Sequence, residues 1–144
     1  MALTRIRFVR AAALALVICA ALGGCGRKDA PAPAARVSVD GAPWDGRPIG
    51  SNADGAPRVV VTLDGEQLIE LPFSEAHTVE IAQADGAVNV VELTGVAVFM
   101  READCDNQDC VRMGEVTMGN LETRVMGGFI ICLPHRLSVE VRGG

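Results

Sequence analysis

The sequence of 144 residues contains no tyrosine, and four Phe and one Trp make aromatic residues only 3% of the chain. Basic residues are also few, with 13 Lys and Arg against 18 Asp and Glu. The first 25 residues hold three of the 13 and no acid, so the remainder has 10 basic and 18 acidic residues and a net charge of −8. Duplex-binding proteins need clustered Lys and Arg, and single-strand binders need exposed aromatic side chains. Composition therefore argues against a nucleic acid as the main partner.

A long apolar run is missing as well. The longest one, Ala11–Leu22, follows Arg5, Arg7 and Arg10. A helix of that length spans about 18 Å, whereas the hydrocarbon core of a bilayer is about 30 Å thick. A basic flank, a short apolar stretch and small residues at its end are typical of a secretory signal peptide. We therefore expect residues 1–24 to be a signal peptide.

The end of this segment carries a second signal. Leu22-Gly23-Gly24-Cys25 resembles a bacterial lipobox, in which a branched residue and two small residues precede a cysteine. The resemblance implies cleavage before Cys25 and attachment of fatty acyl chains such as palmitate to its thiol. Two or three acyl chains anchor a protein stably in a membrane. We expect a lipoprotein of the cell envelope, on the outer face of the cytoplasmic membrane or in the periplasm or outer membrane.

Residues 25–57 are predicted to form a tether. Five of the seven prolines fall between Gly26 and Pro57, and Gly, Ala and Asp fill much of the remainder. No apolar periodicity interrupts this composition, which is typical of a semi-flexible spacer. The only Trp, Trp44, lies here and is either a partner anchor or a side chain folded back on the domain edge; we favour the second.

Residues 58–144 are predicted to form a small all-β domain. Asp64-Gly65 and Asp85-Gly86 each separate two β-rich runs, which is a strong hairpin signal. Short strands with turn signals at regular spacing favour a β-sandwich or a small β-barrel. About 85 residues bury only a marginal core, so a covalent link would help. Strands are expected over 58–63, 66–71, 78–83, 87–93, 96–100, 116–118, 124–126, 129–133 and 137–141.

Two cysteine motifs carry a family resemblance. The first is Arg101–Val111, with Cys105 and Cys110, and the second is Ile130–Leu137, with Cys132 in Cys-Leu-Pro before a last strand. Together they resemble the envelope proteins built on a domain similar to the second domain of the transcription factor NusG. The resemblance implies a compact β module for residues 58–144 and no firmly assigned activity, since fold does not carry function. We expect a non-catalytic domain that needs no cofactor and binds an envelope partner.

Three cysteines remain once Cys25 is lipidated. An exported protein favours disulfides, and an odd number leaves one thiol over. A Cys110–Cys132 bond closes a loop of roughly two dozen residues and contributes about 3 kcal/mol in the chain-entropy model. A Cys105–Cys110 bond closes a smaller loop and is either a weaker link or a labile redox pair. The family resemblance leads us to expect that the three converge, with one disulfide and the third thiol nearby.

A metal site is the alternative for these residues. Cys105, Cys110, Cys132 and His135 together would offer three thiolates and an imidazole. Their spacing is looser than that of zinc ribbons, and the acidic residues around the first two cysteines disfavour thiolates. The four are therefore weak metal candidates. The second functional hypothesis is accordingly a redox or metal-handling accessory protein at the membrane surface.

Overall fold

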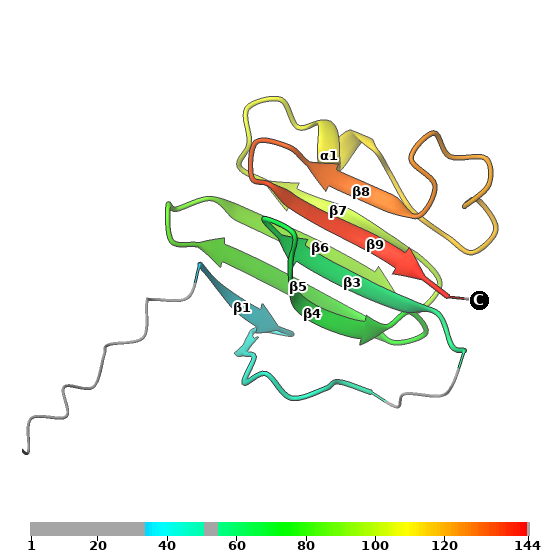
Figure 1. Ribbon diagram of the computed structural model, residues 1–144, viewed down its shortest axis with the longest axis horizontal. Helices are drawn as coiled ribbons and strands as arrows, with labels where there is room; N and C mark the ends of the chain where they lie inside the picture. The colour runs from blue at the N-terminus through cyan, green and yellow to red at the C-terminus, as the bar shows by residue number, and fades with distance from the viewer. Residues whose placement is uncertain (1–33, 51–54, 144) are drawn as a thin grey trace, which may run out of the picture. The chain divides into compact units, whose positions relative to one another are not determined.

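The computed structural model describes residues 34–50 and 55–143 (Figure 1). They contain nine strands, arranged in two antiparallel sheets, and one short helix. The five-stranded sheet has the order β2-β1-β5-β6-β7. Its strands are β1 (Ala35–Val39), β2 (Ala42–Pro43), β5 (Ala76–Gln83), β6 (Val88–Thr94) and β7 (Val98–Ala103). The four-stranded sheet has the order β4-β3-β9-β8. Its strands are β3 (Arg58–Leu63), β4 (Glu66–Pro72), β8 (Phe129–Cys132) and β9 (Leu137–Arg142).

The core lies between the two sheets, which Figure 1 shows layered face to face. Successive side chains of a strand point to opposite faces, so every second residue can enter such a core. In β9 these are Leu137, Val139 and Val141, and Val139 lies opposite Val61 of the neighbouring β3. The opposing sheet contributes alternate residues of β5 and β6, namely Val79, Ile81, Val91 and Leu93. The predicted all-β fold is confirmed, in its sandwich form.

The predicted hairpins are confirmed at both Asp-Gly pairs. Asp64 and Gly65 have φ angles of 52° and 85° and join β3 to β4. Positive φ at both central residues gives the turn a twist that matches the flanking strands, and glycine adopts it without steric cost. Asp85-Gly86 lies in the turn that joins β5 to β6 in the five-stranded sheet. Turn chemistry thus sets the local order of the strands.

The predicted tether over 25–57 is wrong for the residues that form β1 and β2. β1 pairs with β5 from Ala35↔Gln83 to Val39↔Val79, and Val39 is buried in the core. The proline content concealed this strand, whose partner residues in β5 lie 40 to 48 positions later in the sequence. The folding back of Trp44 is confirmed, since its side chain packs against the core cluster. The tether residues 25–33 and the signal peptide 1–24 lie outside the described residues.

A polar contact fastens the turn after β1 to β5. Asp40 Oδ2 lies 2.8 Å from His77 Nδ1, and Asp40 Oδ1 accepts a hydrogen bond of 2.8 Å from the backbone N–H of Thr78. The His77 hydrogen bond, and then the Thr78 one, hold the pKa of Asp40 below its ordinary value. Both contacts favour the carboxylate, so the β1–β2 turn is anchored by charge as well as by strand pairing.

Two further strand predictions are wrong. Of residues 116–118, only Val116 pairs, in an isolated bridge with Val98, and residues 124–126 lie in turns. The chain from Met113 to Gly128 instead forms a loop after the short helix α1 (Asp109–Arg112). No helix among the described residues is long and apolar enough to cross a membrane. In Figure 1, α1 lies beside β7 and β8, and the loop runs from α1 to the start of β8.

Candidate functional site

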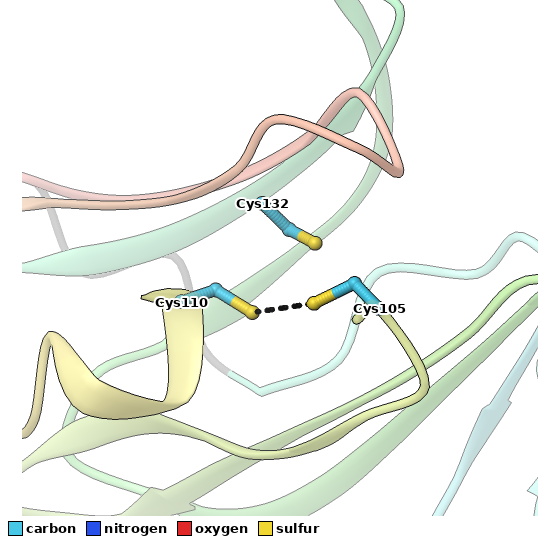
Figure 2. Close-up of side chains that lie close together, drawn as sticks. All are labelled: Cys105, Cys110 and Cys132. Atoms are coloured by element: carbon cyan, nitrogen blue, oxygen red, sulfur yellow. Dashed lines mark hydrogen bonds between the residues drawn. The ribbon is translucent and has the colours of Figure 1, made fainter. Parts of the chain in front are cut away.

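Three cysteines from three separate segments meet at one place in the core. Cys105 lies in the loop after β7, Cys110 lies in α1, and Cys132 is the last residue of β8. Figure 2 shows their side chains pointing toward one another. The three Sγ atoms all lie within 4.8 Å of one another, and those of Cys105 and Cys110 are 3.8 Å apart. The predicted convergence is confirmed, but the expected disulfide is not, since Cys105, Cys110 and Cys132 are all free cysteines in this structure.

The cluster formed by Cys105, Cys110 and Cys132, the cysteine triad, is sealed from solvent. Cys105 is 5% exposed, and Cys110 and Cys132 are each 1% exposed. Burial, followed by the neighbouring Cys132 and Cys105 thiols, raises the pKa of Cys110 to about 12. A thiol must lose its proton to act as a nucleophile or a metal ligand. Cys110 is therefore a neutral thiol at neutral pH.

The turn before α1 brings two of the three sulfurs together. Gln108 has a left-handed φ of 53°, and its side-chain amide donates hydrogen bonds to the carbonyls of Ala103 and Cys105, at 2.5 and 2.6 Å. These bonds give hydrogen-bond partners to two backbone carbonyls, one at the end of β7 and one just after it. The chain thereby reverses within a few residues, so that Cys105 faces Cys110 across the turn.

His135, the weak candidate for a fourth metal ligand, does not join the triad. Its Nδ1 lies 2.8 Å from Asn89 Oδ1, and its Nε2 lies 3.3 Å from Asp104 Oδ1. Both ring nitrogens thus have other partners. Among the described His, Cys, Asp and Glu residues, the group close enough to share a metal ion contains the three cysteines without a fourth member. His135 is therefore not placed to share a metal ion with the three cysteines.

His135 instead links the two sheets. It is 8% exposed in the β8–β9 turn, and its carbonyl accepts a hydrogen bond of 3.0 Å from Gln83 of β5. Asn89 of β6, which its ring contacts, is fully buried. Neither Gln83 nor Asn89 was predicted from the sequence to have a role. The signal was present at Asn89, because it alternates with the core residues Val91 and Leu93 on the inner face of β6.

Replacement of His135 by Ala is expected to lower the free energy of unfolding by about 1–3 kcal/mol, because it leaves the fully buried Asn89 without that partner. Urea unfolding followed by circular dichroism measures the change. Leu133→Ala is the matched control, since Leu133 is 78% exposed in the same turn. Equal stability of the two variants contradicts the role assigned to His135.

The comparison with known proteins now identifies the architecture. The family model for NusG domain II matches residues 12–144. The chain belongs to the NusG domain II family. The resemblance drawn from the two cysteine motifs is confirmed, and the triad is built from those motifs. No protein with a curated function matches the chain.

Solved structures share the fold of this family member. A DUF1312 family protein from Enterococcus faecalis V583 is 23% identical, with a TM-score of 0.53 over 61% of this chain and 98% of that one. The Lin0431 protein from Listeria innocua is 22% identical, with a TM-score of 0.52 over 61% of this chain and 97% of that one. A DUF1312 family protein from Ruminococcus gnavus ATCC 29149 is 31% identical, with a TM-score of 0.47 over 60% of this chain and 99% of that one. The first two similarities establish the fold alone.

Proposed function

We propose that this protein is a lipid-anchored bacterial envelope protein whose non-catalytic β domain binds another envelope protein. The anchor is Cys25, at the end of the lipobox-like sequence Leu22-Gly23-Gly24-Cys25. The binding surface is the loop between α1 and β8, because it combines a fixed backbone with exposed apolar side chains. That combination is the observation on which the proposal rests.

Arg124 fixes the backbone of this loop. Its guanidinium group donates hydrogen bonds to the carbonyls of Met113, Glu115, Gly127 and Phe129, at 2.9, 2.7, 3.0 and 3.3 Å. The planar guanidinium carries five N–H donors in a rigid arrangement and can hold several carbonyls at once. The loop is therefore ordered before a partner arrives, which lowers the entropy lost on binding.

The loop exposes apolar side chains to solvent. Val125 is fully exposed, and Met126 is 43% exposed beside it. Met118, in the same loop, is 39% exposed, and Phe129, the first residue of β8, is 37% exposed. An open hollow of ≈ 390 Å³ is lined by Met113, Thr123, Arg124, Val125 and Met126. Gathered apolar exposure of this kind marks a contact surface, whereas single exposed hydrophobic residues are common.

The charge of the chain favours a protein over a lipid surface as the occupant. Residues 26–144 carry 10 basic and 18 acidic residues, so this part of the chain is negatively charged. Anionic lipid headgroups attract basic segments and repel acidic ones. The loop therefore docks a protein partner, and the acyl chains on Cys25 provide the contact with the membrane.

The non-catalytic part of the proposal rests on the chemistry of the buried groups. The triad is sealed, and burial keeps the thiol of Cys110 protonated at neutral pH. Both nitrogens of His135 are engaged by Asn89 and Asp104. Catalytic thiols and bases need access to substrate and a pKa near the working pH. These groups are built to stabilise the fold.

A photo-cross-linking amino acid at position 125 of the full chain tests the proposed surface in cells. We expect one adduct with a different envelope protein, identified by mass spectrometry. Its yield should fall about tenfold or more when Met126→Asp is added, because charge at the centre of an apolar contact costs at least 1.4 kcal/mol.

Position 133 provides the matched control, since Leu133 is 78% exposed in the β8–β9 turn, at the opposite end of β8 from the proposed surface. The same adduct at both positions contradicts the assignment of the loop. An adduct with lipid, or with a second copy of the chain, overturns the choice of partner.

A redox role of the triad is the second candidate function. Its support is the meeting of three thiols from three segments within 4.8 Å, where a structural disulfide needs only two. In this hypothesis the buried cysteines of the triad are oxidised in the envelope. The chemistry of that response is developed next.

A further inference from the structure

The triad holds three sulfur atoms, whereas a disulfide uses only two, so the third sulfur needs an explanation. Each Sγ lies within 4.8 Å of both others, and Cys105 and Cys110 come within 3.8 Å. Sulfur atoms at such distances reach bonding distance by small side-chain rotations, provided that the Cα atoms are about 7 Å apart or less. The triad therefore offers three possible pairs in place of one.

Charge decides between a bound metal ion and a disulfide at this site. Three thiolates around a monovalent or divalent soft metal ion leave a net negative charge, which an apolar interior disfavours unless a cation is near. The arginines closest in sequence point to other partners, since Arg112 pairs with Asp109 and Arg136 pairs with Asp64. Burial also keeps Cys110 protonated. A disulfide with one thiol is uncharged and fits the site.

We propose that Cys105, Cys110 and Cys132 share one exchangeable disulfide, so that the oxidised domain holds a single S–S bond whose partners can change within the triad. This proposal rests on the second candidate function and specifies its chemistry. The external co-reactant is a disulfide-bearing oxidant of the envelope, which meets the thiols during folding, before the domain closes over the triad.

Formation and exchange of the bond are two separate steps. In formation, two triad thiols lose two protons and two electrons to become one disulfide, and the external disulfide gains them to become two thiols. In exchange, the third sulfur loses its proton and attacks one sulfur of the internal bond. A new S–S bond forms, the old one breaks, and the released thiolate takes up a proton. Exchange involves no net oxidation.

The two kinds of bond have different structural consequences. A Cys105–Cys110 bond links the end of β7 to α1 within one short segment. A bond from Cys132 to either of them links that segment to β8, and β7 and β8 belong to different sheets. Exchange therefore moves the covalent link from a local position to one that joins the two sheets. It therefore decides whether α1 is covalently linked to β8. Helix α1 leads directly into the loop Met113–Gly128, which Arg124 holds.

Tryptic peptides distinguish the two kinds of bond. Cleavage after Arg101 and Arg112 places Cys105 and Cys110 together in peptide 102–112, and cleavage after Arg124 and Arg136 places Cys132 in peptide 125–136. A local bond stays inside one peptide, whereas a bond to Cys132 joins two. The experiment uses full-length protein recovered from an oxidising compartment, quenched with acid, unfolded, alkylated and digested without reduction.

The wild-type protein is expected to show one disulfide and one alkylated thiol within the triad, with both the local and the joined peptides present. Cys105→Ser should give a Cys110–Cys132 bond, Cys110→Ser a Cys105–Cys132 bond, and Cys132→Ser a Cys105–Cys110 bond. The double variant Cys105→Ser with Cys110→Ser is the control and should leave Cys132 fully alkylated.

Three outcomes overturn the proposal: three alkylated thiols in the wild-type triad, a folded single variant in which both remaining thiols are alkylated, or stoichiometric metal in the native mass. Circular dichroism in reductant verifies the fold of each variant, and alanine replaces serine in any variant that fails to fold. The cross-link at position 125 is scored in the same variants. Loss of exchange with the cross-link retained disproves the triad chemistry alone, and the reverse result disproves the docking surface alone.

Discussion

A fragment of residues 58–144 is expected to lose cooperative folding, whereas a fragment of residues 34–144 keeps it. The shorter fragment lacks β1, which pairs with β5 along its whole length and buries Val39. It also lacks Trp44 and Ile49, which pack against the core, and the Asp40 contact with His77. Their loss lowers the free energy of unfolding by about 5 kcal/mol, because each buried apolar side chain contributes about 1.5–3 kcal/mol.

A loss of this size is comparable with the whole stability of a small domain, about 5–15 kcal/mol. Urea unfolding of the two fragments, followed by far-ultraviolet circular dichroism, measures it. The fragment 34–144 is the control, since it lacks only residues that precede β1. A fragment 58–144 that unfolds at the same urea concentration as 34–144 contradicts the importance assigned to β1.

Replacement of Cys25 by Ser is expected to abolish lipidation and the cut before residue 25. The acyl chains attach to the Cys25 thiol in our proposal, and serine has no thiol to receive them. Each buried methylene of an acyl chain contributes about 0.8 kcal/mol to membrane binding, so their loss removes the anchor. The measurement is the mass of the N-terminal peptide, which should carry lipid in the wild type and the uncut residues 1–24 in the variant.

Cys19→Ser is the matched control for this prediction. Cys19 lies in the same apolar run, inside the segment that is expected to be removed. The control protein should start at a lipidated Cys25 in the same yield as the wild type. A Cys25→Ser protein that is cut at the same place and remains equally bound to the membrane contradicts the lipoprotein proposal.

Hairpins were the part of the fold that local sequence predicted well. Asp64-Gly65 adopts positive φ angles at both residues, and few other pairs do so easily. Strand β9 shows the second local signal, because its buried residues Leu137, Val139 and Val141 alternate with more exposed ones. Both signals act between residues that are neighbours in sequence, so both could be read from the sequence alone.

Strand prediction from the local sequence failed at two places, strand β1 and the loop after α1. Alternation of Val37 and Val39 in a proline-rich stretch is too short to indicate a strand unless the edge of β5 is known to be free. Arg124-Val125-Met126 looks β-prone, yet Arg124 binds four backbone carbonyls and holds the chain in turns. Tertiary hydrogen bonds outweigh the weak intrinsic preference for strand there.

The candidate site was predicted in part. The cysteine motifs indicated that Cys105, Cys110 and Cys132 meet, and they do. The same reasoning made His135 a weak ligand candidate, because it follows Cys132 closely in sequence. The β8–β9 turn directs its ring toward Asn89 of the other sheet. Proximity in sequence could not reveal this, since the direction of a side chain in a turn depends on the backbone.

The sequence by itself determined the all-β class, the hairpin turns and the family, because these follow from turn chemistry, alternation and motif spacing. The tertiary structure alone decided that β1 completes the five-stranded sheet, that the triad is sealed and that His135 bridges the sheets. Each of these depends on contacts between residues far apart in the chain. Such contacts form only when the two sheets pack, and packing is a property of the whole sandwich.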